Sequence, residues 1–213
     1  MRLMTLLGAA LAVAGSAVTA PAHAAPATEI HNVYAVDADG TPDREYQVTD
    51  SPAQVSDCRA SPAAVSAGIY SCYPNAASAD VCWPSTSSSL LCADDPWSKK
   101  LHLVTYSGTL PKVSPIPTPT PYGIELDDGS KCRGYAGGPG GRQSRKDGYV
   151  VAYYCDGAAN VLRRPDGPAT IDRSVALWTV QVGRTDSATD DYPAPQTRTV
   201  VAAWFAAANV PNN

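Results

Sequence analysis

Phenylalanine and methionine are almost absent from this sequence of 213 residues. The single phenylalanine is Phe205, and the two methionines are Met1 and Met4. A hydrophobic core must therefore be built from valine, alanine, leucine, tyrosine and the four tryptophans. Because tyrosine and tryptophan carry polar atoms that need partners when buried, hydrogen bonds from these side chains are expected inside the fold.

A surplus of positive charge is also missing, since the formal net charge is −4. A mildly acidic chain has no general attraction for nucleic acid or for anionic membranes. After residue 24, no apolar stretch is long enough to span a bilayer. Neither nucleic acid nor a membrane span is therefore expected once the first 24 residues are removed.

Histidine is scarce, and only His31 and His102 lie beyond residue 24. The motifs G-x-S-x-G, H-E-x-x-H, the P-loop and G-x-G-x-x-G are all absent from residues 25–213. We interpret His102 as a packing or surface residue of a strand rather than as a general base. No catalytic, cofactor-binding or metal-binding residue is predicted, and enzymatic activity is not favoured.

The first 24 residues have the pattern of an export signal. Arg2 is followed by an apolar stretch over residues 3–18 and by the small-residue site Ala22-His23-Ala24. A charged start, an apolar stretch and an A-x-A exit form the tripartite secretion signal. We expect cleavage between Ala24 and Ala25 and a secreted, extracellular protein.

Six cysteines, an even number, are typical of disulfides in an exported chain. They are Cys58, Cys72, Cys82, Cys92, Cys132 and Cys155. Sequence alone permits 15 pairings, but the short segments between successive cysteines favour the local pairs 58–72, 82–92 and 132–155. Each loop closed in this way contributes about 3 kcal/mol in chain-entropy models.

The pattern of apolar residues predicts a mainly β fold. We expect a single disulfide-stabilised antiparallel sheet, or a small sandwich or barrel, with one or two short helical turns near residues 61–66 and 75–80. Strand or turn signals occur at residues 29–36, 101–106, 122–126, 127–130, 149–155 and 175–182. Residues 199–205 fit either a strand or a helical face.

The domain organisation expected from the sequence has three parts. Residues 1–24 form the signal peptide, residues 25–50 a polar N-terminal extension, and residues 51–213 the β-rich domain. Prolines at nearly alternate positions of residues 111–121 predict an extended strap within that domain. A linker between two domains is the alternative interpretation of the strap.

A glycine-rich segment concentrates positive charge in this acidic chain. It carries Arg133, Arg142, Arg145 and Lys146. Basic side chains and glycine backbone N–H groups together can bind phosphate, sulfate or carboxylate. These four residues are the candidate contact loop for an anionic extracellular or envelope ligand, and a solvated hairpin tip is the alternative.

Several runs resemble small secreted, cysteine-containing proteins of high-GC Gram-positive bacteria. The resemblance rests on residues 76–84, 121–132, the glycine-rich run to Gly148, and residues 149–155. It covers roughly residues 58–182. It implies secretion and paired cysteines, and it assigns no activity and no catalytic residue.

These observations leave three classes of function. A non-catalytic extracellular or cell-envelope binding module is favoured, because it needs only a rigid scaffold and an exposed contact surface. A secreted protease inhibitor is the first alternative, with the 82–92 loop or the strap at Lys112 as the contact segment. An atypical hydrolase is the second, for which Glu125, Asp127 and Asp128 could supply carboxylates, although a solvated turn explains them more simply.

Overall fold

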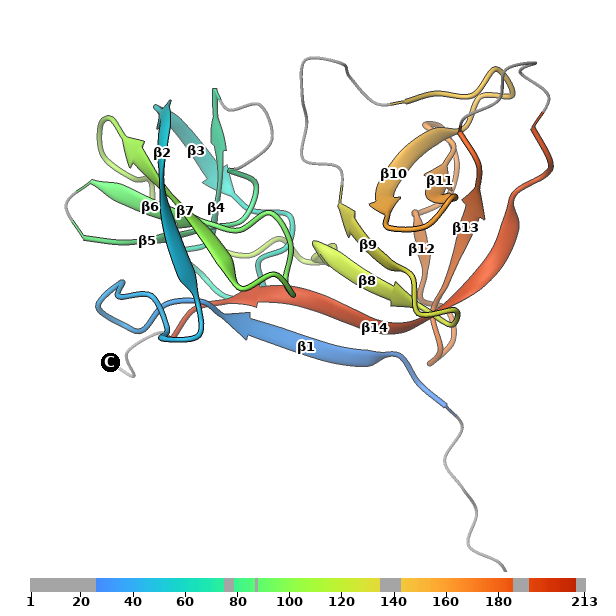
Figure 1. Ribbon diagram of the computed structural model, residues 1–213, viewed down its shortest axis with the longest axis horizontal. Coiled ribbons are helices and arrows are strands. Elements are labelled where there is room, and N and C mark those ends of the chain that lie inside the picture. The colour runs from blue at the N-terminus through green and yellow to red at the C-terminus, as the bar shows by residue number, and fades with distance from the viewer. Residues whose placement is uncertain (1–25, 75–78, 87, 135–142, 186–191, 210–213) are drawn as a thin grey trace, which may run out of the picture.

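The structure, a computed structural model, describes residues 26–74, 79–86, 88–134, 143–185 and 192–209. These residues form 14 strands and no helix. The strands make one six-stranded and one eight-stranded sheet, which occupy two lobes that lie side by side (Figure 1). The predicted mainly β fold with disulfides is confirmed.

The first lobe is the six-stranded sheet. Its strands, in spatial order, are β2 (Gln47–Val55), β7 (Lys100–Tyr106), β6 (Ser89–Cys92), β5 (Cys82–Pro84), β4 (Tyr70–Tyr73) and β3 (Asp57–Ala60). Strands β3 to β7 follow one another as an antiparallel meander, and β2 adds to β7 in parallel. Consecutive short strands joined by turns are the arrangement that connections containing serine, proline and aspartate favour.

Strand β7 is buried on both of its faces. Leu101 and Leu103 pack in a core shared with β14, while Val104 and Tyr106 pack in a second core within the first lobe. This division follows the period-2 alternation of side chains along a strand. The strand predicted at residues 101–106 is therefore confirmed.

The second lobe is a closed six-stranded barrel, which we call the barrel. Its strands are β8 (Gly123–Leu126), β9 (Lys131–Gly134), β10 (Val150–Cys155), β11 (Asn160–Arg163), β13 (Thr179–Gly183) and β14 (Gln196–Ala207). Closure occurs because β14 pairs with both β8 and β13. The short strand β12 (Ile171–Asp172) adds to β13 outside this ring. Residues 199–205, which fitted a strand or a helix, belong to β14.

Two strands extend from the barrel to the first lobe. Strand β1 (Glu29–Tyr34) pairs in parallel with the second half of β14, and both run beneath the two lobes in Figure 1. Residues 25–50 were expected to be a polar extension, and this expectation is wrong. They supply β1 and the start of β2, and their polar composition reflects the exposed faces of these strands.

The helical turn expected at residues 61–66 is also absent. This segment forms turns, and Ala64 makes an isolated parallel bridge to Ala206 of β14. The N–H of Val65 donates to Ala206 O, and the N–H of Ala206 donates to Ala63 O. The backbone of this segment is thus bonded to a strand, which outweighs its local preference for a helix. The other expected turn, at residues 75–80, lies largely outside the described residues.

All three predicted disulfides are present. Cys58–Cys72 joins β3 to β4, Cys82–Cys92 joins β5 to β6, and Cys132–Cys155 joins β9 to β10. Each bond links residues that face each other on adjacent antiparallel strands. Each loop is therefore a hairpin pinned near its base, which is the geometry that the spacing of the cysteines predicted.

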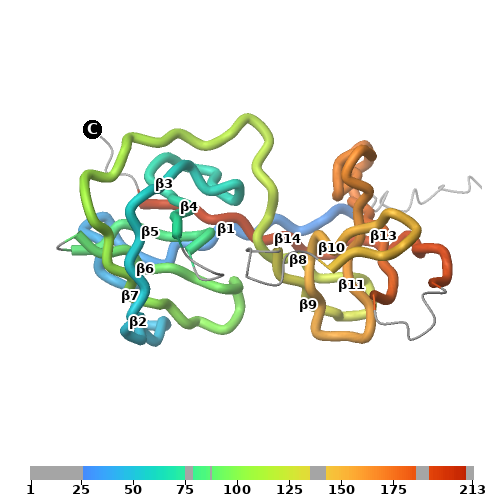
Figure 2. Tube along the Cα trace, turned by 90° about the horizontal axis from the view of Figure 1, so that it is seen from above, coloured from blue at the N-terminus to red at the C-terminus, as the bar shows by residue number. Residues whose placement is uncertain are grey.

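The proline-rich strap crosses from the first lobe to the barrel in extended conformation. It begins beyond β7 and ends at β8, and Figure 2 shows it along the periphery of the molecule. Hydrogen bonds fasten it at both ends: Tyr70 Oη donates to Pro111 O, and Tyr153 Oη donates to Pro121 O. Near the barrel end, Thr120 N donates to Pro62 O and Arg173 donates to Pro119 O.

Gly123 allows the two lobes to pack closely. A Cβ atom at this position would lie 2.5 Å from Cγ of Pro96 and 2.7 Å from the ring of Trp97, which are residues of the first lobe. We expect Gly123→Ala to lower the free energy of unfolding by about 1–3 kcal/mol, as overpacking of a rigid contact does. Urea unfolding followed by tryptophan fluorescence measures this change.

Gly157→Ala is the matched control, because an added Cβ there would meet only Ser130 Oγ at an ordinary 3.5 Å. Its free energy of unfolding should change by no more than about 0.5 kcal/mol. Equal effects of the two substitutions would show that the lobes do not pack tightly at Gly123.

Candidate functional site

The described residues of the predicted contact loop differ in exposure. Arg133 and Lys146 are exposed, and Arg142 lies outside the described residues. Arg145 is buried, with a side chain that is 0% exposed. The prediction that Arg145 contacts an external anion is therefore wrong, and the three described residues of the loop do not share one surface.

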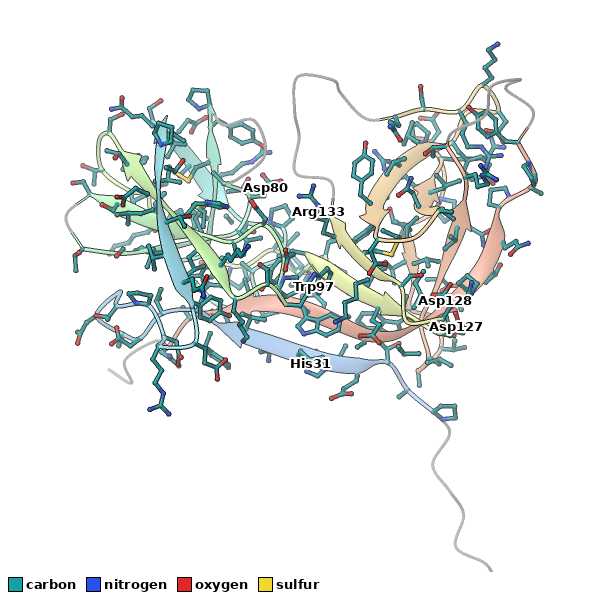
Figure 3. All side chains as sticks on the ribbon, in the orientation of Figure 1. His31, Asp80, Trp97, Asp127, Asp128 and Arg133 are labelled. Carbon is teal, nitrogen blue, oxygen red and sulfur yellow. A yellow bond between two sulfur atoms is a disulfide. The ribbon has the colours of Figure 1, made fainter. Side chains whose placement is uncertain are left out.

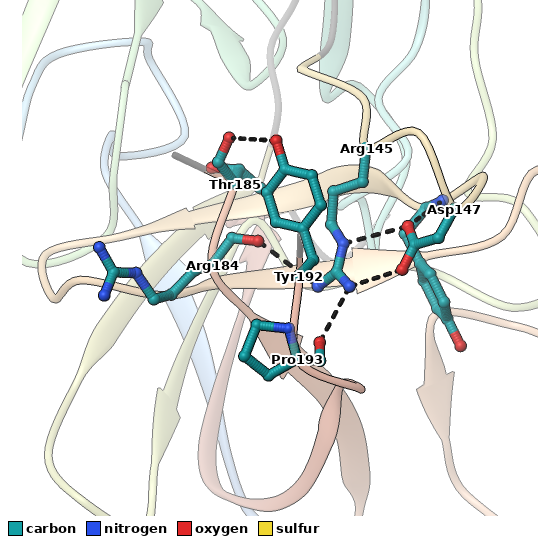
Figure 4. Close-up of polar contacts among 7 residues, drawn as sticks. Arg145, Asp147, Arg184, Thr185, Tyr192 and Pro193 are labelled. Atoms are coloured by element: carbon teal, nitrogen blue, oxygen red, sulfur yellow. Dashed lines mark hydrogen bonds and ion pairs between the residues drawn. The ribbon is translucent and has the colours of Figure 1, made fainter. Parts of the chain in front are cut away.

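Arg145 instead makes its polar contacts within the protein, as Figure 4 shows. Its guanidinium forms a forked pair with Asp147 and donates to Pro193 O at 2.9 Å. The guanidinium also lies over the ring of Tyr192, with 4.6 Å between Cζ and the ring centroid. Partial burial opposes ionisation of Asp147, but the hydrogen bonds from Arg145 and from Tyr149 N–H outweigh it and lower the pKa of Asp147. The positive charge is thus neutralised within the protein.

The acidic turn considered for glycoside cleavage is a structural turn. Asp127 and Asp128 both form ion pairs with Arg198 of β14. The hydrogen bond from Arg198 lowers the pKa of Asp127, and the hydrogen bond from Ser130 N–H lowers the pKa of Asp128. Two carboxylates that stay ionised and paired in this way do not provide a general acid.

His102 is partly exposed and lies between two polar groups. Its Nε2 is 3.0 Å from Oδ2 of Asp94, and its Nδ1 is 3.2 Å from Oγ1 of Thr49. The Thr49 hydroxyl is also within 3.4 Å of Leu101 O, and it lies on β2 at the edge of the sheet. His102 therefore connects strands of the first lobe, and its partner Asp94 reaches the cavity described next.

A cavity of about 470 Å³ lies between the lobes, and we call it the inter-lobe cleft. The first lobe lines it with Ser61, Asp80 and Asp94, and the barrel lines it with Tyr153, Arg163 and Thr170. Clefts of about 300–1,000 Å³ between structural units are usual sites for small ligands. This cleft is therefore the candidate functional site.

Asp80 is a partly buried carboxylate on the first-lobe wall of the cleft. Its Oδ1 accepts a hydrogen bond of 3.0 Å from Ser71 Oγ, and its backbone carbonyl accepts one of 2.6 Å from Ser61 Oγ. Burial raises the pKa of Asp80, against the lowering effects of Ser71 and of the positive charge of Arg59. The ionised form is thus incompletely solvated and would gain from a donor or cation in the cleft.

Arg163 stands on the opposite, barrel wall at the end of β11. Within the described part of the chain its guanidinium makes no ion pair and no side-chain hydrogen bond. On the first-lobe wall, Asp94 Oδ2 contacts His102, but its Oδ1 is buried without a partner among the described residues. The two walls therefore carry opposite charges that do not pair with each other.

Opposite charges also lie on the two lobes beside the cleft. Figure 3 shows Asp80 at the edge of the first lobe and Arg133 across from it at the edge of the barrel. Arg133 is exposed on β9, next to Gly134, which lines the cleft. One residue of the predicted contact loop thus lies beside the cleft, whereas Arg145 and Lys146 do not line it.

Sequence reasoning missed this cleft because its walls come from well-separated segments. Asp80, Asp94 and Arg163 share no motif, and only the fold brings them to one cavity. The one available signal was an aspartate two positions from each cysteine of one disulfide, Asp80 before Cys82 and Asp94 after Cys92, since that disulfide holds both ends of the hairpin still. The barrel side offered no comparable pattern.

Comparisons with known proteins found no similarity from which to assign a function. No family model matches the chain, and neither a curated protein nor a solved structure gives a significant match. The residues that the structure describes contain no group of three or more His, Cys, Asp or Glu side chains placed to hold a metal ion. In the same residues there is no helix long and apolar enough to cross a membrane.

Proposed function

We propose that this protein is a secreted, non-catalytic binding protein that holds a small polar ligand in the inter-lobe cleft. The observation that carries the proposal is the cleft itself: Arg163, which has no ion-pair partner among the described residues, lines the barrel wall, and the partly buried Asp80 and Asp94 line the first-lobe wall. A ligand with both an anionic and a cationic group, such as an amino acid or a short peptide, would satisfy both walls. Guanidinium forks bind carboxylates well, and a cation would stabilise the ionised Asp80.

Location outside the cell is supported by two separate features. Three disulfides join adjacent strands, and such bonds persist mainly in oxidising compartments. The first 24 residues have the composition of a cleavable export signal. N-terminal sequencing of the protein from culture medium should therefore begin at or near Ala25.

Binding in the cleft can be tested with Arg163→Gln. A panel of free amino acids, dipeptides and tripeptides is compared with acetylated or amidated forms and with neutral sugars, and melting temperature is the readout. A ligand at about 100 times its Kd stabilises a protein by about 2.7 kcal/mol, which is several degrees in melting temperature. We expect such a shift with ligands that carry both an anionic and a cationic group, and we expect the Arg163→Gln variant to lose this shift.

The neighbouring Arg164 provides a matched control. Arg164 is exposed and packs over Tyr149 rather than lining the cleft. Arg164→Gln should therefore keep the full ligand-induced shift. If neutral sugars bind and Arg163→Gln leaves their effect on the melting temperature unchanged, the proposed ligand class is wrong. If no ligand shifts the melting temperature of the parent protein, the cleft does not bind the ligands of this panel.

A further inference from the structure

The segment around Lys112 is a second candidate contact site, separate from the inter-lobe cleft. Lys112 is exposed in the extended strap, while its neighbours Leu110 and Val113 pack partly against the core of the first lobe. Pro111 fixes the backbone immediately before Lys112. The lysine side chain is therefore held outward on a segment whose flanking side chains are anchored.

Hydrogen bonds brace the backbone on both sides of the Lys112–Val113 peptide bond. Pro111 O accepts from Tyr70 Oη at 2.9 Å, and Val113 O accepts from Gly68 N at 3.3 Å. Two residues before Pro111, Thr109 O accepts a hydrogen bond of 3.0 Å from Tyr106 Oη. The bracing groups belong to the first lobe, where the Cys58–Cys72 disulfide pins the hairpin that contains Tyr70.

The groups that an external partner would need are left open. Among the described residues, no hydrogen bond is made by the N–H or C=O of Lys112, by those of Leu110, or by the N–H of Ser114. Figure 2 shows this part of the strap along the periphery of the molecule. An approaching chain could thus pair with this backbone and enclose the lysine without moving the scaffold.

We propose that residues 109–114 form an inhibitory loop for serine proteases that cleave after lysine. Such enzymes bind an extended backbone and hold the basic side chain in a pocket with a carboxylate at its base. A loop that is already extended and braced loses little conformational entropy on binding, and this raises affinity. The role is separate from ligand binding in the inter-lobe cleft and does not depend on it.

The two braces also explain why the loop would inhibit rather than be degraded. Attack of the protease serine hydroxyl on the Lys112 carbonyl forms an acyl-enzyme and breaks the bond to the nitrogen of Val113. The proton of the serine hydroxyl passes through the protease histidine to that nitrogen, which leaves as a neutral amine. Because Pro111 O and Val113 O stay bonded to Tyr70 and Gly68, that amine remains next to the acyl group. It can attack the acyl carbon and return a proton to the serine oxygen, which re-forms the peptide bond and the serine hydroxyl, so cleavage is readily reversed.

Trypsin serves as the probe. The inhibition constant of the protein for trypsin is measured from the hydrolysis of a chromogenic lysine substrate. The parent protein should inhibit with one molecule per enzyme. Lys112→Arg should retain inhibition, whereas Lys112→Ala should weaken it by at least about a thousandfold, as loss of a central anchoring residue does. Lys100→Ala, at another exposed lysine on β7, should inhibit as the parent does.

Tyr70→Phe tests the brace separately from the contact residue. It removes only the hydroxyl bonded to Pro111 O, so inhibition should weaken about tenfold and cleavage at Lys112–Val113 should be faster by mass spectrometry. The proposal is wrong if trypsin is neither inhibited nor able to cleave at this bond. It is equally wrong if the parent is cleaved there and released as quickly as an ordinary substrate, or if Lys112→Ala inhibits like the parent.

Discussion

Replacement of Trp83 by alanine is expected to lower the free energy of unfolding by about 3–5 kcal/mol, the range for truncating a buried tryptophan. Trp83 is 0% exposed and lies in the core that the first lobe shares with β14. Its Nε1 donates a hydrogen bond of 2.8 Å to Ala207 O. Truncation would leave a large cavity and an unpaired buried carbonyl at the place where the lobes join. Urea unfolding followed by circular dichroism gives the value.

Trp83→Phe separates these two contributions. It keeps most of the ring volume but removes the donor to Ala207 O, so a smaller loss of about 1–3 kcal/mol is expected. Tyr34→Ala is the control for removing an aromatic side chain from a strand, because Tyr34 is 47% exposed. A loss in the control equal to that in Trp83→Ala would contradict the central place given to Trp83.

Arg145→Met should also destabilise the protein strongly. Breaking a buried ion pair costs about 3–5 kcal/mol, and we expect about 2–3 kcal/mol here because the Asp147 carboxylate can be solvated again. Asp147 is 38% exposed, whereas the Arg145 side chain is 0% exposed. The substitution also leaves Pro193 O without its donor. Chemical unfolding at neutral pH measures the effect.

Arg44→Met is the matched control, since Arg44 is exposed and makes no ion pair or side-chain hydrogen bond within the described residues. A second variant, Arg145→Met with Asp147→Ala, should recover part of the loss, because it removes the carboxylate left without its partner. If Arg145→Met leaves stability unchanged while weakening binding of an anionic ligand, Arg145 belongs to a contact surface after all.

The covalent framework and most strands could be predicted because they depend on local pattern. Three pairs of cysteines each flank a hairpin, so proximity in sequence predicts proximity in space. Large apolar side chains alternate at Tyr122, Ile124 and Leu126 in the strand expected at residues 122–126, and all three are buried. Over residues 175–182 the pattern overestimated the strand, since β13 begins only at Thr179 and Val175 is 59% exposed.

What the sequence did not reveal depends on partners that are distant along the chain. The cationic character of Arg145 was visible, but its burial depends on Tyr192 and Pro193, which lie more than 40 positions away. The strand β14 could not be assigned from residues 199–205, because alanine and valine fit either periodicity. The cleft is a product of these long-range pairings, and its charges could not be assembled from any local motif.

The passage of β1 and β14 through the junction has a consequence for the proposed binding of a ligand in the inter-lobe cleft. Proteins that close around their ligands swing two domains about a few flexible residues, but here paired strands and the hydrogen bonds around Ala206 join the lobes. The cleft is therefore held at one width before a ligand arrives. Association should follow a single kinetic phase whose rate rises in proportion to ligand concentration, and selectivity should come from the dissociation rate, because a fixed cavity releases a poorly matched molecule quickly.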